Sequence, residues 1–302
     1  MPSPAVYPIL EILPEWVLEP EALGSKEKFW YRRPDGESAW LFKYPQSRTG
    51  QHWSEKISAE IAARMGILHA RVELAIFQDT RGSVAETFAR GGRSLFHGNQ
   101  ILAGKVLGYN PQQRFGQSDH TLANIFLALE QTFTSRASLR RAKAMFVEYL
   151  VLDAVIGNTD RHHENWGILR KRTRSRWTVM LAPTFDHASS LGRELRDEAR
   201  GKCRQRLLRD NQVGAYAEKA TGAIHWNKTD KRGLSPLELV RRAASLHPAF
   251  FNPALARLER LDRQGVESVV NRVPEDWMTP TARKFAIELM CYTVGQLRGV
   301  SP

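Results

Sequence analysis

The sequence predicts an α+β fold with two lobes, a smaller strand-rich lobe followed by a larger helical one. Alternating apolar and aromatic runs, which are typical of strands, gather in the first part of the chain around one helical pattern. Longer stretches with apolar residues at helical spacing fill most of the rest. Because strands and helices are segregated in this way, we expect an N-lobe over residues 1–92 and a C-lobe over 93–302.

The predicted elements of the N-lobe are an arm or short first strand (1–22), a hairpin (29–44), a helix (53–65) and a second strand pair (72–78 and 82–88). The hairpin is predicted because aromatic, alternating runs flank Arg-Pro-Asp-Gly, a tetrapeptide that favours a tight turn. The helix is predicted because Ile57, Ile61 and Met65 recur every four residues and so form one apolar face. Gly66 is its expected C-terminal cap.

The predicted elements of the C-lobe are helices over 121–133, 139–157, 236–246, 253–261 and 281–299, and two short strands over 166–169 and 176–183. The second helix has the strongest pattern, because its apolar residues line one side together with Asp153, and Gly157 ends it. A basic turn joins the two strands. No internal repeat interrupts this order.

Composition excludes several classes of protein. The chain has 302 residues, 42% of them hydrophobic, and is long enough to bury a core without covalent staples. Its two cysteines exclude a disulfide framework and a cysteine-based zinc site. It has no apolar run of the roughly 18 residues that a membrane span needs, and its N-terminus does not resemble a secretory signal. The cytoplasm is therefore the expected location.

The segment most informative about chemistry is GNTDRHHENWGIL, residues 157–169, which follows the long helix and precedes the strand pair. Asp160 and Asn165 stand five residues apart in it, and Asp186 follows the strand pair. This order suits phosphoryl transfer, because Asp160 could accept the proton of an attacking hydroxyl while Asn165 and Asp186 supply oxygen ligands to Mg²⁺. Lys43, at the end of a predicted strand, could neutralise the α- and β-phosphates of ATP.

These segments resemble the HipA-like kinases, which are bacterial Ser/Thr protein kinases of toxin–antitoxin type. LGSKEKFWY (23–31) corresponds to the nucleotide-binding loop, LFKYP (41–45) to the strand with the lysine, and WSEKISAEIAARMGI (53–67) to the helix with the paired glutamate. GNTDRHHENWGIL and LAPTFDHASSLG correspond to the two catalytic segments. The Asp-Arg-His-x-x-Asn string is also similar to the catalytic loop of phosphatidylinositol 3/4-kinases. The resemblance covers most of the chain and implies a bilobal protein-kinase-like fold that uses ATP and Mg²⁺.

The resemblance also implies roles for neighbouring residues. His162 would be a structural member of the catalytic loop that hydrogen-bonds the backbone, and Arg161 could neutralise the transferred phosphate. Glu55 would pair with Lys43 by its match to the family helix. Glu60 is the alternative, because the two glutamates lie about 140° apart on the helix and only one can point inward.

The nucleotide site is expected to use Gly24, Ser25, Lys26, Lys43, Glu86 and Phe88. Glu86 and Phe88 belong to AETFARGG (85–92), the expected hinge against adenine. The segment LGSKEKF contains one glycine, so Lys26 or Lys28 could contact phosphate in place of a glycine-rich backbone. In HipA-like proteins the corresponding loop can be phosphorylated on serine, which makes Ser25 the candidate autophosphorylation site.

The chain is strongly basic. Its 44 Lys and Arg against 32 Asp and Glu give a net charge of +12, which on its own points to nucleic acid or another anionic partner. Twelve of the basic but only four of the acidic residues lie between Arg170 and Arg209, on both sides of Asp186. We therefore interpret residues 170–209, termed the basic run, as a surface that attracts an acidic protein substrate, with nucleic acid involved only indirectly.

The sequence favours an ATP- and Mg²⁺-dependent kinase that phosphorylates Ser or Thr of a protein. The resemblance implies a translation component such as an aminoacyl-tRNA synthetase as the substrate and an antitoxin as a partner. Two alternatives stay open. The similarity to phosphatidylinositol kinases allows a lipid or small-molecule kinase, and a kinase fold without activity could bind nucleic acid or a partner through the basic run.

Overall fold

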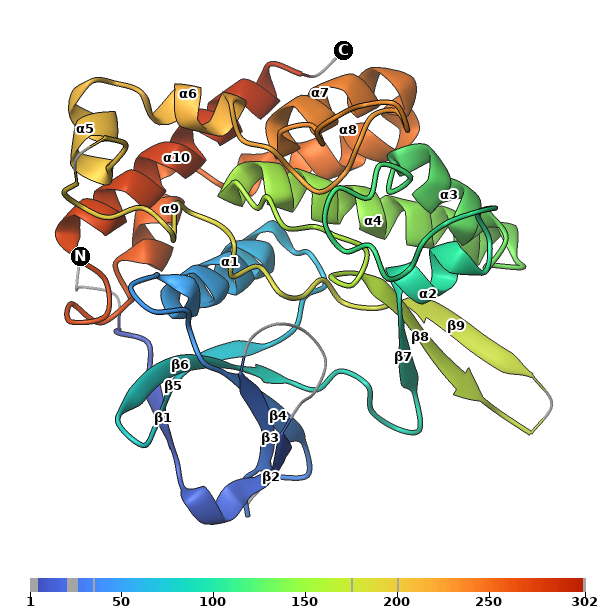
Figure 1. The fold of residues 1–302 in the computed structure, drawn as a ribbon, viewed down its shortest axis with the longest axis horizontal. Coiled ribbons are helices and arrows are strands. Elements are labelled where there is room, and N and C mark those ends of the chain that lie inside the picture. The colour runs from blue at the N-terminus through green and yellow to red at the C-terminus, as the bar shows by residue number, and fades with distance from the viewer. Residues whose placement is uncertain (1–4, 21–26, 35, 175, 200, 301–302) are drawn as a thin grey trace.

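The computed structural model describes residues 5–20, 27–34, 36–174, 176–199 and 201–300. Its N-terminal part is a curled sheet, and helices make up most of the remainder (Figure 1). The predicted α+β fold with a sheet-rich part and a helical part is therefore confirmed. No helix in the described ranges is long and apolar enough to cross a membrane.

One sheet joins the strands of the N-terminal part in the spatial order β1-β5-β6-β4-β3-β2. These strands are β1 (Ile9–Ile12), β2 (Val17–Pro20), β3 (Lys28–Arg32), β4 (Ala39–Lys43), β5 (Val72–Phe77) and β6 (Thr80–Glu86), with a 3₁₀ turn, η1, at Pro14–Trp16. β1 runs parallel to β5, and the other neighbours are antiparallel. Both predicted strand pairs are present, as β3–β4 and β5–β6. Gln78 and Asp79 join the second pair with φ of 46° and 62°, as a tight two-residue hairpin turn requires.

The C-terminal part contains the remaining helices and a small sheet. The helices are α2 (Gly98–Ala103), α3 (Leu122–Glu130), α4 (Arg136–Ile156), α5 (Arg204–Arg209), α6 (Val213–Glu218), α7 (Pro236–Leu246), α8 (Pro248–Ala256), α9 (Arg263–Val270) and α10 (Pro280–Arg298), with a 3₁₀ turn, η2, at Arg257–Arg260. The sheet joins β7 (Ser94–His97), β8 (Gly167–Arg172) and β9 (Trp177–Leu181) in that order. Because β7 pairs with β8, it fixes the chain that leaves the N-terminal sheet beside the strand that follows the GNTDRHHENWGIL segment.

The helix α1 (Gln51–Met65) packs between the N-terminal sheet and the C-terminal helices (Figure 1). Ile57, Ile61 and Met65 are fully buried, as their spacing predicts, in a core that also contains Leu74 of β5. Gly66 ends the helix with a left-handed φ of 70°. Because both sides of α1 are covered, its inward polar residues lie at the junction of the two parts.

The helix α4 is the centre of the C-terminal part, since α7, α8 and α10 all pack against it. Its second half is buried almost throughout, and Gly157 ends it with a φ of 64°, as predicted. The catalytic-loop candidate, residues 158–165, follows at once. The position of this loop is therefore set by a helix whose second half is buried almost throughout.

One helix boundary was predicted wrongly, and several short elements were not predicted. The helix expected over 253–261 begins at Pro248 as α8, and its last residues form η2. Pro248 occupies the first helical position, and Pro253, the first residue of the predicted range, lies inside the helix. The elements β7, α2, α5, α6 and α9 are each at most eight residues long and carry too short a periodic pattern to be recognised.

Candidate active site

A cavity of about 500 Å³, termed the first cavity, lies between the N-terminal sheet and the segments that follow α4. It is lined by residues from β3, β4, β6, β7 and α2 and from both catalytic segments, among them Lys28, Trp30, Leu41, Lys43, Glu86, Phe88, Leu95, Arg114, Asn165, Phe185 and Asp186. Most of the described residues that the sequence assigned to nucleotide or metal binding therefore meet in one cavity.

Lys43, at the end of β4, lies close to two carboxylates. Its Nζ is 3.0 Å from Oδ1 of Asp186 and 3.6 Å from Oε2 of Glu55. Burial alone would lower the pKa of Lys43, but the two carboxylates outweigh burial and raise the pKa above its ordinary value. The ammonium group is therefore charged at neutral pH and is held at the inner end of the first cavity.

The two glutamates considered for Lys43 have different partners. Glu55 is buried and accepts a hydrogen bond from the backbone N–H of His187 at 2.9 Å, so α1 and the second catalytic segment meet at its carboxylate. Glu60 lies on another side of α1, where it binds Nζ of Lys56 at 2.7 Å. The geometry therefore selects Glu55 as the partner of Lys43.

The loop between Asp160 and Asn165 is held by its own hydrogen bonds. The side-chain amide of Asn165 donates to the carbonyl oxygen of Asp160 at 2.8 Å, and the amide oxygen of Asn158 accepts from the backbone N–H of Asp160 at 3.1 Å. On the carboxylate of Asp160, Oδ2 accepts from the hydroxyl of Ser189 at 3.3 Å. These contacts fix the direction in which the Asp160 carboxylate points.

His162 lies in the same loop and has its predicted contact with the backbone. Its Nδ1 accepts a hydrogen bond from the N–H of Glu164 at 3.1 Å. Burial, followed by the nearby charge of Arg114, lowers the pKa of His162 to about 3, so the ring is neutral. Arg114 reaches this ring from the loop between α2 and α3, with Nη2 3.0 Å from Nε2.

Arg161 does not face the cavity, which contradicts the expectation that it neutralises phosphate. Its guanidinium group is buried and forms two 2.7 Å hydrogen bonds with the carboxylate of Asp153 on α4. It also donates to the carbonyl oxygens of Asn165 and Phe185. Arg161 therefore joins the two catalytic segments without lining the first cavity.

Asn165 and Asp186 offer oxygen donors to the same cavity. Asn165 uses its amide nitrogen on the loop backbone, so its amide oxygen remains as an acceptor. Asp186 has a left-handed φ of 58°, which turns the chain sharply after Phe185. The described residues hold no cluster of three or more His, Cys, Asp or Glu that could bind a metal without help. One amide and one carboxylate next to room for phosphates fit Mg²⁺, which is commonly held by one or two side chains together with substrate phosphates.

The expected hinge lies at the outer wall of the first cavity. Glu86 ends β6 and pairs with Arg90, and the Phe88 ring lies 5.4 Å from the Phe185 ring, so both predicted residues line the cavity. Trp30 of β3 also lines the cavity. Gly24, Ser25 and Lys26 lie outside the described residues.

A second cavity, of about 340 Å³, is lined by Asp160 and by the loops before α3 and before α7. Arg114 lines both cavities. Sequence reasoning missed Arg114, because it stands in an irregular loop with no motif to mark it. The candidate general base therefore faces one cavity, while the candidate phosphate and metal residues face the other.

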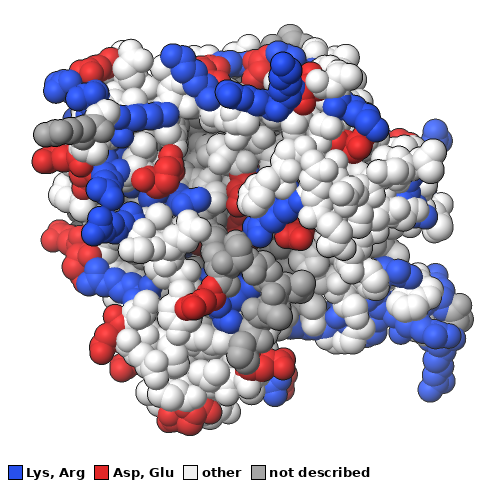
Figure 2. Space-filling model, in the orientation of Figure 1, with Lys and Arg blue, Asp and Glu red and all other residues white. Residues whose placement is uncertain are grey.

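The basic run is divided between two regions of the molecule. Its first half lies on the β8–β9 hairpin, where Lys and Arg dominate, and its second half surrounds α5, where acidic residues are interspersed (Figure 2). Several of these cations are used internally: Arg204 pairs with Asp197 at 2.8 Å, and Arg170 covers the Trp177 ring. None of the described residues at 170–176 or 196–209 lines either cavity. The basic run is therefore not one continuous surface beside the site, contrary to our interpretation.

Comparison with known families decides the classification. The profile described as the HipA-like C-terminal domain matches residues 21–251, which is most of the chain. The chain belongs to the HipA-like C-terminal domain family. No curated protein sequence matches it.

Solved structures agree with this HipA-like assignment at the level of the fold. The Helicobacter pylori proinflammatory kinase CtkA is 18% identical, with a TM-score of 0.75 over 97% of this chain and 96% of that one. A chain of the Shewanella oneidensis MR-1 toxin–antitoxin complex of HipA, HipB and operator DNA is 14% identical, with a TM-score of 0.59 over 95% of this chain and 67% of that one. Family and fold together support a kinase.

Proposed function

We propose that this HipA-like chain is an ATP- and Mg²⁺-dependent kinase that phosphorylates a serine or threonine hydroxyl of a protein. The observation that carries the proposal is the separation of roles between the two cavities. Lys43, Asn165 and Asp186 line the first cavity, whereas Asp160 lines the second. Phosphoryl transfer needs a donor and an acceptor that approach one reaction centre from different sides, and this arrangement provides two such sides.

The proposed reaction assigns one task to each residue. The acceptor oxygen forms a bond to the γ-phosphorus of ATP, the bond from that phosphorus to the oxygen of ADP breaks, and Asp160 takes the hydroxyl proton. Lys43, oriented by Glu55, binds the α- and β-phosphates. Asn165 and Asp186 would hold Mg²⁺, which neutralises charge on the phosphates when bound.

The remaining assignments complete the nucleotide site. Glu86 and Phe88 would contact adenine at the hinge, and Gly24, Ser25 and Lys26 would cover the phosphates, with Ser25 as the autophosphorylation site. Lys28 lines the first cavity and could contribute to phosphate binding. An antitoxin as partner is supported by the complex of HipA with HipB, and the proposed substrate is a translation component such as an aminoacyl-tRNA synthetase.

Incorporation of radioactive phosphate from ATP tests the proposal, with wild type compared with Asp160→Ala. We expect autophosphorylation or protein phosphorylation by the wild type and its loss in the variant. Equal incorporation by the two proteins would contradict the proposed role of Asp160. A lipid or small-molecule kinase is the second candidate, because the Asp-Arg-His-x-x-Asn string is similar to the catalytic loop of phosphatidylinositol kinases and fully exposed Leu107, between α2 and α3, could approach a membrane. Transfer to an inositol lipid, without transfer to any protein, would favour that candidate.

A further inference from the structure

The second cavity is bounded by three segments that are far apart in sequence. Thr159 and Asp160 of the catalytic loop form one side. Phe115 lies in the loop before α3, and Lys231 and Arg232 lie in the loop before α7. Phe115, Lys231 and Arg232 belong to no motif that the sequence singled out. A ligand in this cavity would contact Asp160 at one side and the two loops at the other.

The loop before α7 is shaped by a close approach of its own backbone. A Cβ atom on Gly233 would lie 2.1 Å from the carbonyl oxygen of Gly222, and one on Gly222 would lie 2.5 Å from that of Leu234. The N–H of Gly222 and the carbonyl oxygen of Leu234 are hydrogen-bonded at 2.9 Å. Only glycine at both positions allows this approach, which holds the neighbouring Lys231 and Arg232 at the cavity.

His120 joins this loop to the catalytic region. Its Nε2 accepts from the indole N–H of Trp166 at 3.1 Å, and its Nδ1 donates to the carbonyl oxygen of Ala223 at 2.9 Å. This pattern requires the neutral ring, and burial lowers the pKa of His120 to about 3. His120 therefore links the loop before α7 to Trp166, which lies directly before β8, and these contacts preorganise the walls of the second cavity.

The charges on these walls are unequal. Arg114, Lys231 and Arg232 are cations, and Asp160 is the carboxylate among the lining residues. Within the described ranges no ion pair joins Lys231 or Arg232 to an acidic side chain, and both are exposed. Two cations that no carboxylate neutralises attract an anionic group of a ligand.

We propose that the second cavity binds an acidic protein segment, with aspartate or glutamate side chains at Lys231 and Arg232 and the acceptor serine or threonine at Asp160. This inference rests on the proposed function and names its substrate class. A protein segment is favoured over a headgroup because the rim also carries Phe115, whose side chain is 74% exposed and can pack against an apolar residue of the same segment.

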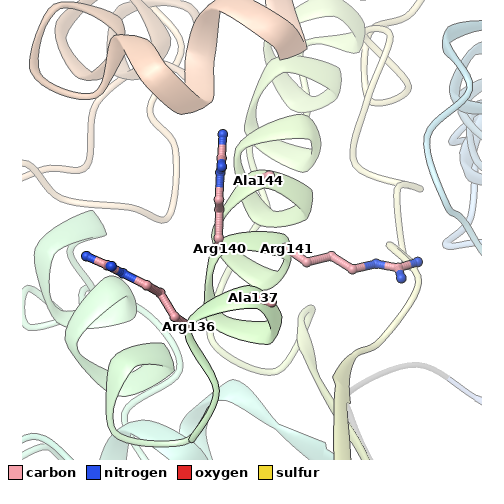
Figure 3. A pocket seen from close by; sticks show the side chains of 5 residues that line it. All are labelled: Arg136, Ala137, Arg140, Arg141 and Ala144. Carbon is pink, nitrogen blue, oxygen red and sulfur yellow. The ribbon is translucent and has the colours of Figure 1, made fainter.

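A second group of arginines provides a matched control. Arg136, Arg140 and Arg141 leave α4 in different directions around an open hollow (Figure 3). At 1.5 Å per residue, Arg140 and Arg136 lie about 24 to 30 Å along α4 from the end that precedes Asp160. Removing two of these exposed charges changes the net charge by the same amount without touching the second cavity.

The test compares Lys231→Ala/Arg232→Ala with Arg136→Ala/Arg140→Ala, using ATP, Mg²⁺ and three serine peptides that carry aspartate, asparagine or lysine next to the serine. For wild type and the α4 variant we expect kcat/KM to be about two- to fivefold higher for the aspartate peptide than for the asparagine peptide. In the Lys231/Arg232 variant this ratio should fall toward one, and added salt should lower it in wild type. Thermal unfolding checks that both variants are folded, and peptide binding by fluorescence anisotropy gives a readout without catalysis.

The outcomes separate this inference from the proposed function. Transfer to the peptides with the same preference in wild type and in the Lys231/Arg232 variant would overturn the inference alone. Transfer to phosphatidylinositol phosphate vesicles that depends on Lys231 and Arg232, with no transfer to peptides, would overturn it in favour of a headgroup. If the wild type shows no ATP-dependent transfer and no ATP turnover, the proposed function is wrong and this inference is overturned with it.

Discussion

Lys43 and Asp186 contact one another across the two parts of the molecule, with Nζ 3.0 Å from Oδ1. The same carboxylate is the proposed Mg²⁺ ligand, so a bound Mg²⁺ would compete with Lys43 for Asp186. The pair thus joins β4 to the second catalytic segment at the first cavity.

Asp186→Asn tests the metal role directly. Asparagine tolerates the left-handed backbone at this position but lacks the charge that Mg²⁺ binding needs. We expect ATP with Mg²⁺ to stabilise wild type by roughly 2–3 kcal/mol at about 100 times Kd, and the Mg²⁺-dependent share of this stabilisation to disappear in the variant. Thermal shift with ATP, with and without Mg²⁺, measures both. An unchanged Mg²⁺ effect would contradict the assignment.

Glu55→Gln and Glu60→Gln form a matched pair on α1. Loss of the Glu55 carboxylate leaves Lys43 with Asp186 alone, so we expect kcat to fall about tenfold or more and KM for ATP to rise. Glu60→Gln weakens the ion pair with Lys56 and should lower the melting temperature with little change in kcat. Steady-state kinetics and thermal unfolding of both variants check this. If Glu60→Gln impaired catalysis more than Glu55→Gln, our choice of partner would be wrong.

Asp160→Asn is expected to remove the general base and keep the shape of the loop. The amide can still accept a hydrogen bond from Ser189, so the fold and the affinity for ATP should remain. Loss of general-base catalysis typically costs about 10² to 10⁴ in rate. Single-turnover phosphate transfer measures the loss, and nucleotide binding serves as the control. A rate within a factor of about three of wild type would exclude Asp160 as the base.

The buried pair of Asp153 and Arg161 is expected to be structural. Asp153→Ala leaves a buried guanidinium group without its carboxylate, which costs about 3 to 5 kcal/mol of unfolding free energy. Asp210→Ala breaks an exposed pair with Arg209 and should leave stability unchanged. Urea denaturation of the two variants provides the comparison. Similar stabilities would show that the buried pair does not hold the catalytic segments together.

Stability should fall on mild acidification because His120 and His162 are neutral in the fold. Burial depresses the pKa of each to about 3, whereas in the unfolded chain the pKa is about 6.5. Below pH 6.5 the unfolded state binds protons that the folded state does not, so the unfolding free energy drops as the pH falls toward the folded pKa. The expected slope is up to about 1.4 kcal/mol per pH unit for each group. Urea denaturation between pH 7 and 5.5 measures it, and His120→Gln should flatten the slope.

Local spacing made the central residues predictable. Asp160 and Asn165 lie within one short segment, and Asp186 follows a strand pair of readable length, so their order was enough to bring them together. The partner of Lys43 needed the helical wheel and the resemblance, and the geometry then agrees with Glu55. Whether these residues act as assigned remains a prediction.

Other features depend on contacts that spacing does not report. Asp153 lies on the apolar side of α4, and only the fold shows that its partner is Arg161, which removes that arginine from the phosphate site. Lys231 and Arg232 reach the site because of the close approach at Gly222 and Gly233, and an isolated pair of basic loop residues has no signature. The basic run was misinterpreted for a similar reason, since charge along the chain does not show that the β8–β9 hairpin and the region around α5 lie apart in the fold (Figure 1).

The left-handed backbone of Asp186 also limits how such a kinase can lose its activity during evolution. Glycine, asparagine and aspartate are the residues that adopt this conformation readily, and a larger or branched side chain would strain the turn after Phe185. A lineage that abandons catalysis can therefore exchange the carboxylate most easily for asparagine or glycine while the fold persists. Inactive descendants of this fold should be recognisable by those two residues at this position, whereas the aspartate found here keeps the carboxylate that the proposed Mg²⁺ site needs.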